Sequence, residues 1–183
     1  MRQPWTEALI NDPGQPSLSG EVLCAWWHGL AYDRASRATL RRSATVADAF
    51  AATAFLSLCA AMMRRFPHAD AETLAERLAP ISLAVAEIDR DDGRSPGTVF
   101  GSPGARGKAL SEARLRLLAG SDETALFLRL LRSAIDQTGR SQSVLATAEL
   151  VRRWQEPPHV RERARRRLLL DYVAVARADR DAA

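Results

Sequence analysis

The chain of 183 residues contains little cysteine, little lysine and few aromatic side chains. Its two cysteines, Cys24 and Cys59, are too far apart in the sequence to form a metal or redox motif, so we expect two small buried thiols in a reducing compartment. No apolar run approaches the roughly 20 residues that a membrane span needs, and the N-terminus lacks a charged-then-apolar leader. These absences predict a cytoplasmic protein that makes no membrane contact.

Alanine, leucine and arginine dominate what is present, and aromatic residues make up only 6% of the chain. This mixture favours helices, and we find no alternating strand pattern of useful length. Apolar periodicity and capping residues predict helices at 20–32, 71–89, 112–120, 122–138, 144–154 and 159–178. Residues 33–42 either continue the first helix or begin a second one. A further apolar helix, through Phe50, Phe55, Leu58 and Met62, follows a capping box formed by Thr45 and Asp48. We expect Asp33, Ser111, Ser121 and Ser143 to cap helices, Gly139 to end one, and Pro80 to break or kink another.

Glycine and proline are concentrated at the N-terminus and in the middle of the chain. The sequence therefore predicts an all-α fold of two helical bundle lobes joined by a long, basic loop rich in glycine and proline. The predicted parts are a flexible leader at 1–19, an N-terminal helical lobe at 20–88, the loop at 89–110 and a C-terminal helical bundle at 111–183.

Charge is unevenly distributed along the chain, whose net charge is +4. Residues 70–92 carry a net charge of −5, whereas residues 94–167 carry a net charge of +8. Lys108 is the only lysine, so nearly every cation is an arginine, whose planar guanidinium can bind two phosphate oxygens at once. The asymmetry suggests one face that meets a polyanion and another that meets protein or solvent.

Segments that resemble enzyme or metal-site motifs lack the residue spacing that those motifs require. The segment after Gly101 resembles a phosphate-binding loop, but five residues separate Gly101 from Gly107 and Ala109 occupies the position of the metal-binding hydroxyl. The three histidines have no partner at ligand or triad spacing, and the acidic turn at 89–93 lacks the spacing of a calcium loop. We therefore expect no catalytic centre, no metal and no cofactor.

Arginines at helical intervals are the remaining candidates for function. Arg34, Arg37 and Arg41 recur at i, i+3 and i+7 with Arg42 beside them, and no carboxylate lies between them. Further cations lie in or after the central loop, where backbone amides could also approach phosphate. The predicted nucleic-acid-binding residues are Arg34, Arg37, Arg41, Arg42, Arg106, Lys108, Arg114, Arg129 and Arg132. The arginine run at 161–167 could serve protein or nucleic-acid contact equally, since Glu162 can pair with Arg166.

Four stretches, taken in order, carry a family resemblance: "AWWHGL…DRASRATLRR", "VFGSPG…ALSEARLRLLAG", "LFLRLLRSAI" and "ELVRRWQEPPHVRERARRRLLLDYV". With these stretches the sequence resembles the CasB family, the small subunit of the type I-E CRISPR Cascade complex. By position, Arg41 and Arg42 match the family's first basic pair; the cations at 108, 114, 129 and 132 match its basic loop and the helices after it. The chain departs from the family at Ala119 and Gly120, where many members have a basic residue, and at its leader.

The resemblance implies a non-catalytic, all-helical subunit of an antiviral complex. Its implied partners are the CasC-type backbone subunits, the CasA-type large subunit, a second copy of itself, and crRNA-bound target DNA, whose displaced single strand it would hold without reading sequence. Two other readings stay open: a helical interaction protein whose arginines only solvate it, and a helical transcriptional regulator. The latter is disfavoured because residues 34–50 lack the glycine-containing turn of a helix-turn-helix.

Overall fold

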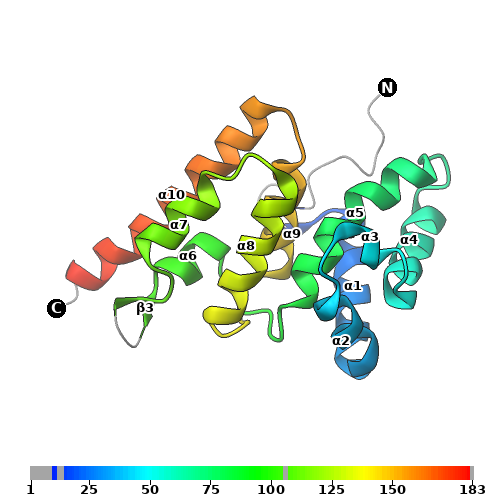
Figure 1. The fold of residues 1–183 in the computed structure, drawn as a ribbon, viewed down its shortest axis with the longest axis horizontal. Helices are drawn as coiled ribbons and strands as arrows, with labels where there is room; N and C mark the ends of the chain where they lie inside the picture. Colours follow the sequence, from blue (N-terminus) through cyan, green and yellow to red (C-terminus); the bar gives the residue numbers. More distant parts are fainter. Residues whose placement is uncertain (1–9, 12–14, 105–106, 182–183) are drawn as a thin grey trace. The chain divides into compact units, whose positions relative to one another are not determined.

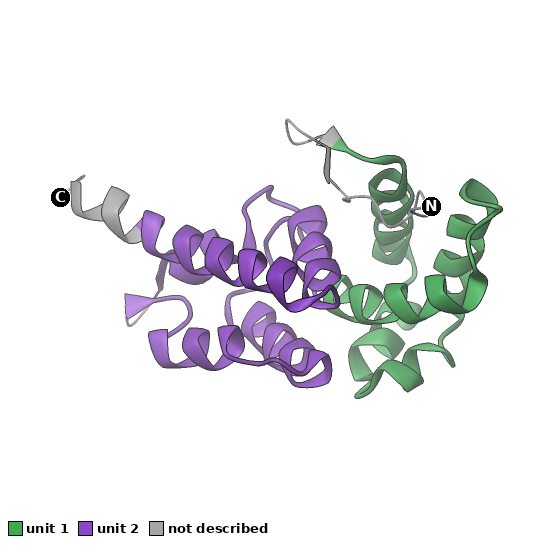
Figure 2. Cartoon of the chain, turned by 90° about the horizontal axis from the view of Figure 1, so that it is seen from above, with its two compact units in different colours: residues 1–86 green, residues 87–183 purple. Residues whose placement is uncertain are grey.

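The computed structural model describes residues 10–11, 15–104 and 107–181. Within these residues the chain forms ten helices and two short hairpins (Figure 1), so the predicted all-α fold class is confirmed. It divides into two compact units, Met1–Ala86 and Glu87–Ala183 (Figure 2). The sequence predicted a joining loop at 89–110, and in the structure the described residues of this segment belong to the second unit. Most of the predicted leader lies outside the described residues.

The described part of the first unit contains five helices and a hairpin of two strands, each two residues long. They are β1 (Ile10–Asn11), β2 (Gln15–Pro16), α1 (Leu18–Tyr32), α2 (Arg34–Arg42), α3 (Val46–Ala49), α4 (Thr53–Arg65) and α5 (Ala71–Ala86). Helix α5 contacts each of the other four helices and is the centre of the unit. Two indole N–H groups hold α1 against its neighbours. Trp27 Nε1 donates to the Val85 carbonyl of α5 at 3.1 Å, and Trp26 Nε1 donates to the Ala54 carbonyl of α4 at 2.8 Å.

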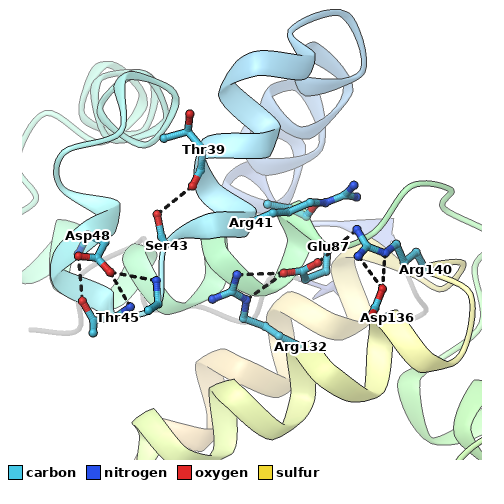
Figure 3. Close-up of polar contacts among 11 residues, drawn as sticks. Thr39, Arg41, Ser43, Thr45, Asp48, Glu87, Arg132, Asp136 and Arg140 are labelled. Carbon is cyan, nitrogen blue, oxygen red and sulfur yellow. Dashed lines mark hydrogen bonds and ion pairs between the residues drawn. The ribbon is translucent and has the colours of Figure 1, made fainter.

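Capping in this unit follows the sequence closely. The Asp33 carboxylate accepts from the Ser36 N–H at 3.0 Å and begins α2. Thr45 and Asp48 form the predicted capping box (Figure 3), but the helix they open ends after a single turn. A second helix, α4, begins at Thr53 and buries Phe55, as the apolar pattern predicted. Phe50, predicted to lie in that buried helix, instead falls between α3 and α4 and is 41% exposed.

Pro80 lies inside α5 and does not end it. The sequence predicted a break or kink, because proline removes one helical N–H and crowds the preceding turn. The helix nevertheless runs unbroken from Ala71 to Ala86, with Pro80 itself buried. The predicted break is therefore absent, because packing of α5 against four other helices outweighs the hydrogen bond lost at Pro80. The kink at Pro80 stays a prediction.

The second unit contains five helices and a hairpin. They are α6 (Pro96–Gly101), β3 (Pro103–Gly104), β4 (Gly107–Lys108), α7 (Glu112–Ala119), α8 (Thr124–Gln137), α9 (Val144–Trp154) and α10 (Pro158–Asp181). Ser111 and Ser143 cap α7 and α9, and Gly139, with a φ of 87°, follows the end of α8, all as predicted. The predicted cap Ser121 is wrong: its hydroxyl donates to the Leu117 carbonyl at 2.8 Å, and α8 begins after Glu123.

Helix α6 was missed in the sequence because it lies within a stretch of glycine and proline. Ser95 caps it and Pro96 occupies its first position, where proline is favoured. Its glycines let it lie directly on α10: a Cβ on Gly97 would come within 2.6 Å of the Leu168 carbonyl oxygen, and one on Gly101 would meet the Tyr172 backbone. The glycines thus serve close helix packing and make the central segment part of a folded core.

Candidate nucleic-acid interface

Helix α2 carries four of the predicted site residues, and they divide into two pairs. Arg34 and Arg42 are exposed and form no ion pair within the part of the chain that the structure describes. Arg37 is only 9% exposed, and its guanidinium carbon lies 5.6 Å from the centroid of the Trp27 ring. Arg41 is half-buried, and its Nε donates to the Ala86 carbonyl at 2.8 Å.

This division follows from the composition of the helix. Leu40 is its only large apolar residue and is fully buried, so the arginine stems beside it complete the inward face. Arg37 and Arg41 therefore hold α2 within the first unit, and Arg34 and Arg42 are its solvent-facing cations. The periodicity that grouped Arg37 and Arg41 as a basic face also fits an inward-facing stripe, and only tertiary contacts separate the two interpretations.

The central basic loop is a hairpin anchored on α10. Strand β3 pairs with β4 in the register Pro103↔Lys108 and Gly104↔Gly107, and Gly107 has a φ of 109°. The ammonium of Lys108 lies 3.8 Å from the centroid of the Tyr172 ring. Arg106, the other predicted cation of this loop, lies outside the described residues.

The remaining site residues are on α7 and α8, which contact each other. Arg114 is exposed on α7, and its Nη1 donates to the Gln137 side-chain oxygen on α8. Arg129 is exposed on α8 and, among the described residues, pairs with no carboxylate. Both arginines belong to the second unit, and their side chains are exposed to solvent.

Arg132 belongs to a buried ionic cluster around Glu87 (Figure 3). Its Nη2 lies 3.0 Å from Glu87 Oε1, and Arg140 Nη1 lies 3.5 Å from Oε2 of the same carboxylate, whose side chain is 8% exposed. Asp136 in turn binds Arg140 at 2.5 Å. Although burial opposes charging of Arg140, its hydrogen bond to Asp136 and the surrounding carboxylates raise its pKa. Arg132 is thus committed to neutralising a buried acid.

The geometry of Arg140 ties this cluster to the beginning of the second unit. It is the one described non-glycine residue with a positive φ, 57°. In this conformation its carbonyl accepts from the backbone N–H groups of Asp89 at 2.8 Å and Arg90 at 3.3 Å. The sequence missed the cluster because Glu87 lies 45 residues before Arg132 and still further before Arg140.

The arginine run at 161–167 is mostly paired. Arg165 lies 2.8 Å from Asp122 and 3.0 Å from Glu162, and Arg166 lies 3.8 Å from Glu162, as its spacing predicted. Arg167 pairs with Asp171 at 2.8 Å. Charges paired in this way offer less to a polyanion than single exposed cations do.

Two further cations, Arg64 and Arg65, are exposed and were not predicted from the sequence. They occupy the last turn of α4, where positive charge stabilises the helix end, and neither pairs with a carboxylate in the described part of the chain. The sequence contains a signal for these cations, because no acidic residue that could pair with them lies within four positions of either arginine. Each is an added candidate for phosphate contact in the first unit.

Comparison with known proteins identifies the family. Residues 36–172 match the family described as CRISPR-associated protein Cse2, a span that includes every predicted site residue except Arg34. No curated protein and no solved structure gives a significant match. No helix in the described residues is long and apolar enough to cross a membrane. The match over residues 36–172 shows that the chain belongs to the Cse2 family of CRISPR-associated proteins, also called CasB, the small subunit of the type I-E Cascade complex.

Proposed function

We propose that this Cascade subunit is not an enzyme and that it binds nucleic acid without sequence specificity, holding the displaced strand of unwound target DNA. It would act in antiviral defence in the cytoplasm, beside a second copy of itself and the backbone and large subunits. The observation that carries the proposal is a set of exposed arginines, in a member of this family, that pair with no carboxylate of the described residues. They are Arg34 and Arg42 in one unit and Arg129 in the other.

The physical basis is release of counterions from phosphate. Each phosphate of a single strand that a cation neutralises contributes roughly 0.7 to the slope of log affinity against log salt. Arginines that bind phosphate do not distinguish bases, so binding is independent of sequence. In RNA-guided complexes the strand exchange is nearly balanced, so a few kcal/mol of contact with the opened strand is enough to favour it.

Some of the predicted arginines already form contacts within the fold, which leaves fewer candidates for phosphate contact. Arg37, Arg41 and Arg132 hold the fold through Trp27, Ala86 and Glu87, so they contribute mainly by maintaining structure. Among the described residues of the family-matched span, the exposed cations that the sequence singled out are Arg42, Arg114 and Arg129. We assign phosphate contact first to these three.

The experiment measures fluorescence anisotropy of labelled single-stranded DNA with the full chain over a series of salt concentrations. We expect tight binding at low salt, a steep salt dependence and equal affinity for unrelated sequences. Arg42→Gln and Arg129→Gln should each lower the slope by about 0.7 if each neutralises one phosphate. Arg167→Gln is the matched control, since Arg167 is 76% exposed but paired with Asp171. Absence of binding at low salt would refute the proposal.

A second candidate function is protein contact without nucleic acid. It is favoured by α10, where Leu170 and Val173 are 67% and 48% exposed next to the mostly paired arginine run. On this reading Leu170→Ser weakens Cascade assembly and the full chain shows no salt-dependent DNA binding. Salt-dependent binding of DNA by the isolated chain would separate the two functions.

A further inference from the structure

A small hollow opens between α7 and α8 of the second unit. Its volume is about 210 Å³, and apolar side chains of Leu110, Leu118, Leu130 and Ala134 line it. Pockets for drug-sized ligands begin at roughly 300 Å³, so this hollow suits one planar ring system and excludes a whole nucleotide. Leu117, 57% exposed, also lines it.

Three polar side chains on its wall are joined by hydrogen bonds. Arg114 donates to the Gln137 oxygen, and Gln137 Nε2 donates to the Ser133 hydroxyl at 2.9 Å. These bonds use one acceptor and one donor position of the Gln137 amide, which has two of each. One donor and one acceptor position are thus left for a ligand, and glutamine side chains use such positions to bind base edges.

The electrostatic surroundings favour an anionic chain. None of the residues that line the hollow is acidic, and Arg114 is one of them. The acids next to it on each helix are occupied: Glu112 lies 3.6 Å from Arg116, and Asp136 lies 2.5 Å from Arg140. Arg129, exposed and without a carboxylate partner among the described residues, comes one helical turn before Ser133. Cations therefore lie beside the hollow on both helices.

We propose that this hollow accepts one unpaired nucleobase of the bound strand. The base would lie against the leucine side chains, its edge would pair with the Gln137 amide, and the flanking phosphates would meet Arg114 and Arg129. This inference rests on the proposed function and adds that the subunit holds a single strand by a base as well as by phosphates. An apolar protein side chain would leave the second donor and the second acceptor position of the Gln137 amide unused, so the polar wall favours a base.

The test compares two single-stranded oligonucleotides of the same length. One, the based strand, carries a base at every position, and the other is abasic at every position. Ser133→Leu fills the hollow from an exposed position, and Gln137→Met removes the amide without changing charge. We expect both variants to bind the based strand at least about fivefold more weakly, since contact with one base typically contributes that much or more. Binding of the abasic strand and the salt slope should stay as in the wild type. Ser57→Leu, at another exposed helical serine, is the control.

Several outcomes would overturn the proposal. One is equal affinity of wild type and both variants for the based strand; another is the same loss on the abasic strand, which would mean a general weakening. Weakened assembly with the other Cascade subunits at unchanged DNA affinity would assign the hollow to a protein side chain. If Ser133→Leu lowers the urea midpoint, Gln137→Met decides the question. A wild-type chain that binds no DNA at low salt refutes the proposed function as well.

Discussion

The ammonium of Lys108 lies 3.8 Å from the centroid of the Tyr172 ring, whose hydroxyl donates to the Leu110 carbonyl at 2.8 Å. One side chain of α10 thus contacts the basic hairpin and the segment that follows it. The Tyr172 side chain is 2% exposed, and burial, together with the charge of Glu112, raises its pKa. The hairpin is held in place by a buried aromatic ring that lies 64 residues away in the sequence.

We expect Tyr172→Phe to destabilise the second unit by about 1 to 3 kcal/mol, because the buried Leu110 carbonyl loses its donor. Tyr172→Leu should also weaken DNA binding, since the cation–π contact of Lys108 is lost. In a Lys108→Gln background the same change should have no further effect on DNA affinity. Urea unfolding and anisotropy measure the two effects. Tyr32→Phe, at a side chain 93% exposed, is the control and should change neither.

Close packing of α6 on α10 predicts a strong effect of one methyl group. Gly101→Ala places a Cβ against the Tyr172 backbone, and we expect a loss of roughly 1 to 3 kcal/mol from overpacking. Gly29→Ala in α1 is the matched control, because nothing lies within 4 Å of that Cβ and alanine favours helix by about 1 kcal/mol. Thermal unfolding should show opposite signs, and a neutral Gly101→Ala would contradict the close approach.

Removing the buried carboxylate of Glu87 should cost about 3 to 5 kcal/mol, because Arg132 loses the acid that neutralises it and Arg140 loses one carboxylate partner and keeps Asp136. We therefore expect Glu87→Gln to lower the urea midpoint of the second unit substantially. Arg132→Gln should likewise act on stability, whereas the exposed Arg129→Gln should stay within about 0.5 kcal/mol and act on the salt slope of DNA binding. A stable Arg132→Gln protein with reduced slope would reverse these assignments.

Burial raises the pKa of the Cys59 thiol to about 11, so its reactive thiolate is scarce in the folded chain at pH 8. In a Cys24→Ser background we expect alkylation to be slow in native buffer and fast in urea. The folded chain favours the protonated thiol, so this contribution to stability is complete below about pH 9 and is lost as pH rises towards 11. Cys59→Ala should lack that part of the pH dependence. Native labelling at the rate of a free thiol would contradict the burial.

Local signals in the sequence determined most of the secondary structure. The caps at Asp33, Thr45, Ser111 and Ser143 act through side chains that accept from backbone N–H groups three residues away, and such short-range chemistry can be read directly from the sequence. The all-α class and the family resemblance have the same origin, since periodicity and ordered motifs are properties of the chain itself. Charge pairing at i, i+4, as between Glu162 and Arg166, was equally visible.

Tertiary structure alone decided which arginines face solvent and which hold the fold. Arg41 and Arg42 are neighbours in one basic motif, yet one binds the Ala86 carbonyl and the other is exposed. Arg132 pairs with Glu87, which lies 45 residues away in the sequence. The need for glycine at position 101 arises only because the Tyr172 backbone of α10 packs against it. Burial and long-range pairing depend on which segments pack together, and that is decided by the sum of many weak contacts that no single motif encodes.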